Sequence, residues 1–404
     1  MDEIELSYIQ DSPSDTQILS QVIGEFQNSH QVRVRITPMD WGEAWSELFT
    51  ISLNGKGPDV SHVGSTWVSS LVAMNALRAF SPREIALLGG AEAFSRPIWE
   101  SAIVEGSEQV WAIPWMAYYY VICYRRDLIK QAGIDELSAF GTVDALNSTI
   151  RRLQGINIEY PWLSPFLPAP SPDLLHMAAS WVWGAGGDFI SKDGQRTLFT
   201  QPQSIYGLKA FYQAQRSIRA PARQWQAEEI LDAFRLGKAA AVLLDIRSAI
   251  QLSDSETADF VRENLGTAII SQTPWYGGSH LVIWRHVQGY PERERAAFAL
   301  IHFLASKGAQ MSFGQKSRDL PVRTDAVDEM FPETHPLTAT VRKANRTGRD
   351  YPSTGLWRRI EFQLAEVLTN IRKEAAENES ADLETLLHNH LNPLAHRLDL
   401  TLKR

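Results

Sequence analysis

The first hundred residues alternate between two hydrophobic patterns. Every second position is apolar over residues 4–8, which is the period of a half-buried strand. Residues 18–26 then carry apolar side chains three or four positions apart, as the buried face of a helix does. Strand patterns return at 32–36 and 58–63, and a helical pattern follows each of them. This alternation is typical of right-handed βαβ units with a mostly parallel sheet.

Local signals place the first of these helices. Ser12 is a capping residue, Pro13 fits the first helical turn, and Asp15 stands three residues after the cap. Such a combination satisfies backbone donors that a helix leaves open at its start. A helix is therefore predicted to begin just after Ser12.

The pattern changes in the second hundred residues. New strand patterns occupy 110–114 and 118–124, and the proline-rich stretch 160–172 is predicted to be a loop, because proline neither donates to a ladder nor continues a helix. From Asp173 the chain is mainly helical, with short strand patterns at 240–245, 266–270 and 280–284. The final fifty residues are predicted to be helical.

Length and charge narrow the class of protein. A chain of 404 residues with 44% hydrophobic residues is too long for one ordinary core and has enough apolar sequence for two, so two lobes are expected. The formal net charge of −8 argues against a partner bound through phosphate neutralisation. Nucleic acid is therefore not an expected partner.

Compartment signals are few. Cys123 is the only cysteine and lies in an aromatic and β-branched run, so a buried, inert thiol is expected and no disulfide forms within the chain. No stretch approaches the roughly 18–20 apolar residues of a membrane span. The chain runs from Met1 directly into a strand pattern without a targeting segment, so an exported protein with this sequence would have lost its signal.

Several short motifs occur in a fixed order along nearly the whole chain. They are Gly57-Pro58-Asp59-Val60 with Gly64-Ser65-Thr66-Trp67, Ala112-Ile113-Pro114-Trp115, Tyr124-Arg125-Arg126-Asp127-Leu128, Ala132-Gly133-Ile134, Gly186-Gly187-Asp188-Phe189, Gly237-Lys238-Ala239-Ala240, Gly277-Gly278-Ser279 and Leu320-Pro321-Val322. In their order and spacing the chain resembles the family 1 extracellular solute-binding proteins of bacterial ABC importers, the maltose-binding protein group.

The resemblance implies a fold and a function. The fold is α/β and periplasmic-binding-protein-like, with two doubly wound lobes joined by a hinge. Residues 1–115 plus 279–321 would form the amino-terminal lobe and 116–278 plus 322–404 the carboxy-terminal lobe, with crossings near 114–118, 275–279 and 320–324. The protein would act in the periplasm or on the outer face of the cytoplasmic membrane, closing its hinge on a small carbohydrate and delivering it to the transmembrane subunits of an ABC importer.

A sugar site needs aromatic planes for C–H faces and polar groups for hydroxyls, and in open α/β sheets it lies beyond the carboxyl ends of the strands. Residues that directly follow the first three strands are therefore candidates: Asp11, Trp41, Ser65, Thr66 and Trp67. The lobe crossings add Trp115, Tyr118, Trp275, Tyr276 and Gly278. The resemblance further implies Asp245, Arg247 and Trp357, and a helix carrying His176, Trp181 and Trp183 is a weaker candidate.

Several candidates also have a structural interpretation. Asp11 could cap the helix that follows Ser12, Asp245 and Arg247 could form an ion pair, and Trp357 could be a core residue of its helix. The sequence also departs from relatives in which an aspartate follows the proline-tryptophan crossover, because Tyr118 and Tyr119 fill that stretch. The remaining tryptophans are expected to serve packing: Trp45, Trp99, Trp162, Trp225 and Trp284.

Enzyme motifs are missing from the sequence. It contains no G-x-S-x-G elbow, no H-E-x-x-H and no Walker lysine followed by Ser or Thr, and the glycine-rich stretch at 184–188 follows a helix rather than a strand. His388 and His390 are two positions apart on a predicted helix, which disfavours a shared metal. We expect no metal, cofactor or catalysis. The alternatives are the same fold binding a polyol phosphate, an anion or a polyamine, and a carbohydrate-active enzyme.

Overall fold

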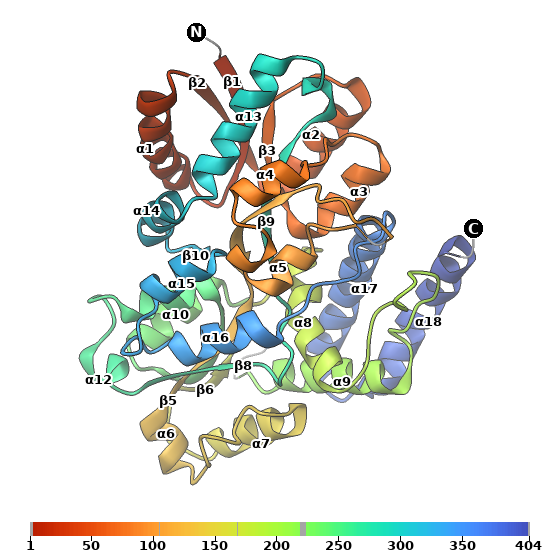
Figure 1. The fold of residues 1–404 in the computed structure, drawn as a ribbon. Helices are drawn as coiled ribbons and strands as arrows, with labels where there is room; N and C mark the ends of the chain where they lie inside the picture. The colour runs from red at the N-terminus through yellow and green to blue at the C-terminus, as the bar shows by residue number, and fades with distance from the viewer. Residues whose placement is uncertain (1–2, 105, 168, 219–223, 403–404) are drawn as a thin grey trace. The chain divides into compact units, whose positions relative to one another are not determined.

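The computed structural model describes residues 3–104, 106–167, 169–218 and 224–402. The chain folds into two compact units, each with its own sheet (Figure 1). Unit 1 comprises Met1–Tyr118, Tyr276–Pro332 and Asp350–Arg358, and unit 2 comprises Tyr119–Trp275, Glu333–Arg349 and Arg359–Arg404. The predicted α/β fold class is confirmed.

Unit 1 has a six-stranded sheet of order β10-β4-β9-β3-β1-β2. Its strands are β1 (Glu3–Gln10), β2 (Arg33–Asp40), β3 (Val60–Gly64), β4 (Ile113–Tyr118), β9 (Gly277–Ile283) and β10 (Leu320–Pro321). β1 pairs in parallel with β2 and β3, whereas β9 runs antiparallel between β3 and β4. The first three strands therefore end at the same edge of the sheet.

Helices cover both faces of this sheet. α1 (Pro13–His30) begins with the predicted capping box, in which the backbone N–H of Ser12 donates to Asp15 Oδ2 at 2.9 Å. α1 lies on the same face as α13 (Pro291–Leu304) and contacts it, whereas α2 (Trp41–Asn54) lies on the other face (Figure 1). The other helices of unit 1 are η1 (Ser65–Trp67), α3 (Val68–Ala73), α4 (Pro82–Leu87), η2 (Ala91–Ala93), α5 (Arg96–Glu100), η4 (Arg285–Val287), α14 (Lys307–Ser317) and α15 (Thr324–Met330).

Unit 2 has a four-stranded sheet of order β6-β7-β5-β8. Its strands are β5 (Tyr120–Arg125), β6 (Tyr160–Leu163), β7 (Ala239–Asp245) and β8 (Leu265–Ile269). The predicted loop at 160–172 is wrong at its start, because β6 pairs in parallel with β7. β6 is an edge strand, where a proline such as Pro161 is tolerated because its missing N–H breaks no ladder.

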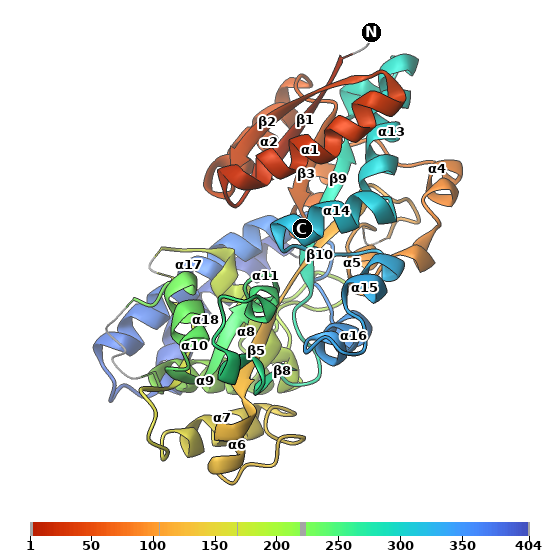
Figure 2. The same ribbon diagram turned by 90° about the vertical axis from the view of Figure 1, so that its left-hand side faces the viewer.

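Long helices pack beside this sheet (Figure 2). α8 (Pro172–Gly184) and α9 (Pro202–Arg216) approach so closely that a Cβ on Gly207 would lie 2.6 Å from the Cα of Val182. A residue with a side chain at position 207 would therefore force the two helices apart. The other helices are α6 (Arg126–Gln131), α7 (Val143–Leu153), α10 (Ala227–Arg235), α11 (Ile246–Ile250), η3 (Gln251–Ser253), α12 (Asp259–Arg262), α16 (Thr338–Thr347), α17 (Trp357–Glu377) and α18 (Leu383–Leu402).

The largest differences between the units and the predicted lobes lie in two segments. Residues 322–332 and 350–358 belong to unit 1, although the sequence interpretation grouped them with the carboxy-terminal lobe. Arg323 accounts for the first difference, because its guanidinium lies 5.8 Å from the Phe94 ring and donates to the Leu88 carbonyl at 3.1 Å. Ser65 accounts for the second, because its hydroxyl donates to Asp350 at 2.8 Å.

Candidate functional site

Three predicted residues meet where the parallel strands of unit 1 end. Trp41 Nε1 donates to Asp11 Oδ1 at 2.7 Å, and the rings of Trp41 and Trp67 lie 5.6 Å apart at 69°. Trp41 is 41% exposed, whereas Trp67 is buried. We call Asp11, Trp41 and Trp67 the strand-end face of unit 1. It presents an accessible indole whose edge is held by a carboxylate.

A buried histidine supports this face. The His62 ring lies 6.0 Å from Trp41, 5.1 Å from Trp115 and 5.2 Å from Tyr8, and it accepts the Ile9 N–H at 3.2 Å through Nδ1. Burial lowers the pKa of His62 to about 3. The pKa of His280 is also lowered to about 3, first by burial and then by His62. Both rings are therefore neutral at physiological pH, and the layer beneath the indoles is uncharged.

A returning segment, Asp350–Arg358, packs against the same edge of unit 1. Asp350 accepts the Ser65 hydroxyl at 2.8 Å, while Thr66 is half-buried. The Arg358 guanidinium lies 5.2 Å from the Trp45 ring and 5.8 Å from the Trp67 ring, within cation–π range. Sequence reasoning missed both Asp350 and Arg358, since neither follows a strand.

Trp357 lies in this same segment. Its ring stacks on Tyr351 at 4.3 Å and 22°, and the side chain is buried. This packing matches the core interpretation that the sequence left open. The sequence did offer one signal for Arg358, since it directly follows Trp357, which the resemblance placed in the site.

The crossing residues of unit 1 differ in burial. Trp115 is only 1% exposed and lies 5.0 Å from the Phe313 ring. Tyr276 is buried, and Tyr118, half-buried, ends β4 opposite Gly277. The side chains of Trp115 and Tyr276 are therefore part of the core, whereas Tyr118 ends a strand parallel to β3. Contact of all three with a ligand stays a prediction.

Gly278 has a backbone reason to be glycine. Its φ is +145°, and a Cβ at this position would lie 2.1 Å from the Met116 carbonyl oxygen. The register between β4 and β9 shifts between Pro114 and Met116, which is the same place. Glycine at 278 therefore permits the close approach of the two strands at this irregularity.

In unit 2, Trp275 is held by helix α8. Its ring stacks on His176 at 3.8 Å and 1°, and its backbone N–H donates to Ser180 Oγ at 2.9 Å. A carboxylate oxygen of the buried Glu361 lies 3.9 Å from His176 Nε2. His176 and Ser180 are four residues apart, so they project from the same side of α8. Sequence reasoning gave His176 little weight because nothing linked it to Trp275.

Asp245 has a structural task at the end of β7. Its Oδ1 accepts the Ser248 N–H at 2.8 Å, and its Oδ2 accepts the Ser248 hydroxyl at 2.7 Å. Asp245 is therefore the N-cap of α11, which also contains the half-buried Arg247. The sequence offered ligand contact or an ion pair for Asp245, and capping was not weighed.

The described residues contain no group of three or more His, Cys, Asp or Glu side chains placed to hold a metal ion. Over the same residues, no helix is long and apolar enough to cross a membrane.

The strand-end face of unit 1 offers an aromatic plane beside a carboxylate. This combination suits a ligand with both apolar C–H surface and hydroxyl groups.

Solved structures of similar fold are numerous. MalE from the phytopathogen Xanthomonas citri, a sugar-binding protein, has a TM-score of 0.81 at 16% identity, over 99% of this chain and 97% of that one. A solute-binding protein from Agrobacterium radiobacter K84, in complex with ribitol, scores 0.77 at 18% identity, over 100% and 98%. Maltose-bound MalE3 from T. maritima scores 0.76 at 18% identity, over 98% and 99%. These likenesses establish the fold.

The comparison with curated proteins found no match. The family model described as bacterial extracellular solute-binding protein matches residues 21–340, which is most of the chain. The match agrees with the two-sheet α/β fold and with the resemblance seen in the sequence, which it confirms. The chain therefore belongs to the bacterial extracellular solute-binding proteins.

Proposed function

We propose that the protein is the extracytoplasmic substrate-binding component of an ABC importer and that its ligand is a mono- or oligosaccharide. The observation that carries this proposal is the strand-end face of unit 1, where the exposed Trp41 indole is fixed by its 2.7 Å hydrogen bond to Asp11. A fixed indole offers a rigid plane on which the C–H face of a sugar packs with little loss of side-chain entropy.

The solved structures of similar fold support the choice of ligand class. Their ligands include α-D-tagatose, maltose, ribitol and acarbose, all of which are rich in hydroxyl groups. A face that combines an indole with a carboxylate suits such molecules better than it suits a polyamine, which needs several carboxylates converging on its ammonium groups. It also suits them better than a phosphate, which needs converging cationic or N–H donors.

The proposed mechanism is hinge closure. A ligand held by residues of both units would stabilise a closed state over an open one by its difference in affinity for the two states. The closed form is then the form that the transmembrane subunits recognise, in the periplasm or on the outer face of the cytoplasmic membrane. The protein's task is binding and delivery without chemical change, as the family's description as solute-binding implies.

A thermal-shift screen tests the ligand class. The purified protein is heated with mono-, di- and trisaccharides, polyols, polyol phosphates, amino acids and polyamines. A ligand at a hundredfold over its Kd stabilises by about 2.7 kcal/mol, which is visible as a raised unfolding midpoint. A response to a sugar supports the proposal, whereas a response only to a polyol contradicts the saccharide assignment. A response only to an anion or a polyamine contradicts the sugar assignment, and release of a shorter sugar from an oligosaccharide contradicts the binding-only role.

A further inference from the structure

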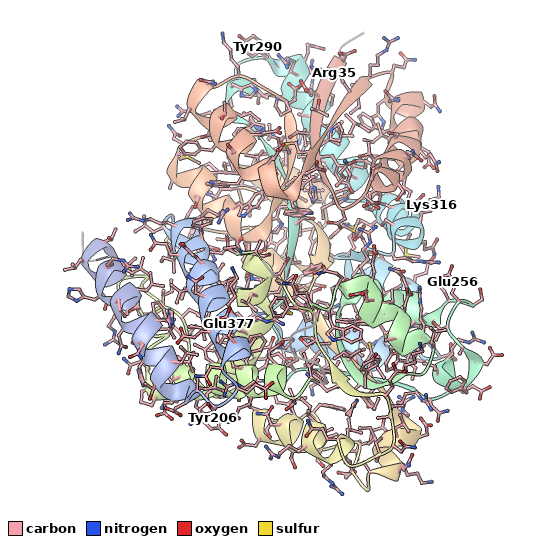
Figure 3. All side chains as sticks on the ribbon, turned by 180° about the vertical axis from the view of Figure 1, so that it is seen from behind. Arg35, Tyr206, Glu256, Tyr290, Lys316 and Glu377 are labelled. Carbon is pink, nitrogen blue, oxygen red and sulfur yellow. The ribbon has the colours of Figure 1, made fainter. Side chains whose placement is uncertain are left out.

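Unit 2 contains a cavity of about 30 Å³ beside the carboxyl-terminal half of α17. A water molecule needs roughly 10–15 Å³ of such space, so the cavity has room for a compact ligand of a few atoms. α17 ends at Glu377, which Figure 3 labels. The walls of the cavity are mainly apolar, and they include Phe166, Tyr212, Ile218, Trp225 and Ala376.

A buried guanidinium also lines this cavity. Arg372 is only 4% exposed, and its Nη2 donates to the Pro165 carbonyl and to Gln215 Oε1, both at 2.8 Å. Gln215 is held in turn by Ser164, whose hydroxyl accepts its Nε2 at 2.8 Å. Arg372 Nη1 has no hydrogen-bond partner among the described residues, although it is buried. A buried N–H donor without an acceptor costs free energy, and a ligand atom that accepts from it removes this cost. Binding of an acceptor at Nη1 is therefore more favourable than at a donor that is already paired.

The charge around Arg372 is not balanced by a nearby acid. The residue forms no ion pair with any carboxylate of the described chain, and its positive group lies 4.2 Å from the Phe166 ring. Burial lowers the pKa of Arg372 to about 10, so the guanidinium remains charged at neutral pH. A cation–π contact and two neutral acceptors leave a net positive charge inside the unit.

A second cation lies at the same cavity. Arg216 donates to the carbonyls of Ala375, Asn378 and Ala381 at 3.3, 3.1 and 3.0 Å, so it binds the last turn of α17 and the segment that follows it. Glu379, the carboxylate of the cavity lining, is exposed. The exposed carboxylates Glu379 and Asp382 both act electrostatically on Arg216, whereas no acid of the described residues acts on the buried Arg372, so the buried part of the site is cationic.

We propose that this cavity is a binding site for a compact monoanion, either a short-chain carboxylate or a halide, held by Arg372 Nη1. The anion accepts the unpaired N–H, and its remaining surface lies against Phe166, Ile218 and Trp225. Binding here is independent of the proposed sugar site, because all the lining residues belong to unit 2 and none belongs to the strand-end face of unit 1.

Thermal shift with sodium formate, acetate, chloride and bromide at equal ionic strength tests the site and separates the two anion classes. At tenfold over its Kd, a bound anion raises the unfolding midpoint by about 2 °C or more. Arg372→Met removes the donor and Ala376→Leu fills the cavity while keeping the arginine, so both variants lose this response. Arg359→Met is the matched control, because Arg359 is an exposed arginine on the same helix, and it keeps the response.

Crystals soaked in bromide give a direct readout. The expected result is an anomalous peak within hydrogen-bond distance of Arg372 Nη1 in the wild-type protein and none in Ala376→Leu. If Arg372→Met does not fold, Ala376→Leu decides the thermal-shift test. The proposal is overturned if none of the four anions raises the midpoint, if Ala376→Leu responds as the wild type does, or if the cavity holds only water in crystals soaked with the anion that gives the largest thermal shift.

Discussion

The strand-end regions of the two units differ in what their side chains are free to do. In unit 1, Trp41 is 41% exposed and its edge is fixed by Asp11. In unit 2, Trp275 is only 4% exposed and stacks on His176, while both oxygens of Asp245 bind Ser248. Residues predicted for the site thus include an accessible indole in one unit and side chains engaged in local structural contacts in the other.

This difference shows that a position near a strand end does not by itself leave a side chain available to a ligand. A side chain that follows a strand is close to the expected ligand, but it binds only if its polar atoms or its ring face are not already used. Trp41 meets this condition because its hydrogen bond occupies the ring edge and leaves ring surface exposed. Both carboxylate oxygens of Asp245 accept hydrogen bonds at the start of α11. A ligand hydroxyl at Asp245 would therefore compete with these capping hydrogen bonds.

The largest loss of stability is expected on substitution of Trp115, which lies beneath the strand-end face of unit 1. Because its side chain is 1% exposed and lies among Tyr8, His62 and Phe313, Trp115→Ala should lower the free energy of unfolding by about 3–5 kcal/mol. Urea denaturation measures this loss. A loss below about 1 kcal/mol, the size usual for surface substitutions, would show that Trp115 is not a core residue.

Acid should destabilise the same region through His62 and His280. The ordinary pKa of each is 6.5 and the folded value is about 3, so below pH 6.5 the unfolded chain takes up protons that the folded protein does not bind. Stability therefore falls as pH falls, by about 2 kcal/mol per histidine between pH 7 and pH 5.

Urea denaturation at pH 7, 6 and 5 measures this slope. His62→Gln and His280→Gln should each flatten it, since glutamine does not titrate. A slope that is the same in the wild type and in both variants would contradict the assignment of neutral, buried rings.

A smaller effect is expected at Asp245 in unit 2. Asp245→Ala removes the N-cap of α11 and should cost about 1 kcal/mol of stability. Asp245→Ser keeps a capping hydroxyl and should recover most of that loss. If Asp245→Ser binds a sugar hit as tightly as the wild type, capping is the main task of this residue; a tenfold loss of affinity in both variants would instead make the carboxylate a ligand contact.

Much of the fold was predictable because hydrophobic period and capping are local signals. The parallel strands β1, β2 and β3 could be read from alternation, and their common edge places Asp11, Trp41 and Trp67 together. Strand β6 was missed because its proline argued against a strand, and only the sheet order shows that β6 is an edge.

The rest depends on contacts between distant segments. Asp350 reaches Ser65 across 285 residues, and Arg372 meets Gln215 across 157 residues. Neither pair carries a spacing or motif that marks it. The burial of Trp115 likewise follows from the place of β4 between β10 and β9 rather than from its neighbours in the sequence.

The most direct test of the sugar-binding account is calorimetry of a sugar identified by the thermal-shift screen, with Trp41→Ala and Phe49→Ala measured side by side. Phe49 is the matched control, because it lies on the same helix and is also 41% exposed. The account predicts that Trp41→Ala weakens binding at least tenfold, about 1.4 kcal/mol, while Phe49→Ala binds as the wild type does. Equal affinity in all three proteins would contradict the assignment of Trp41 to the sugar site.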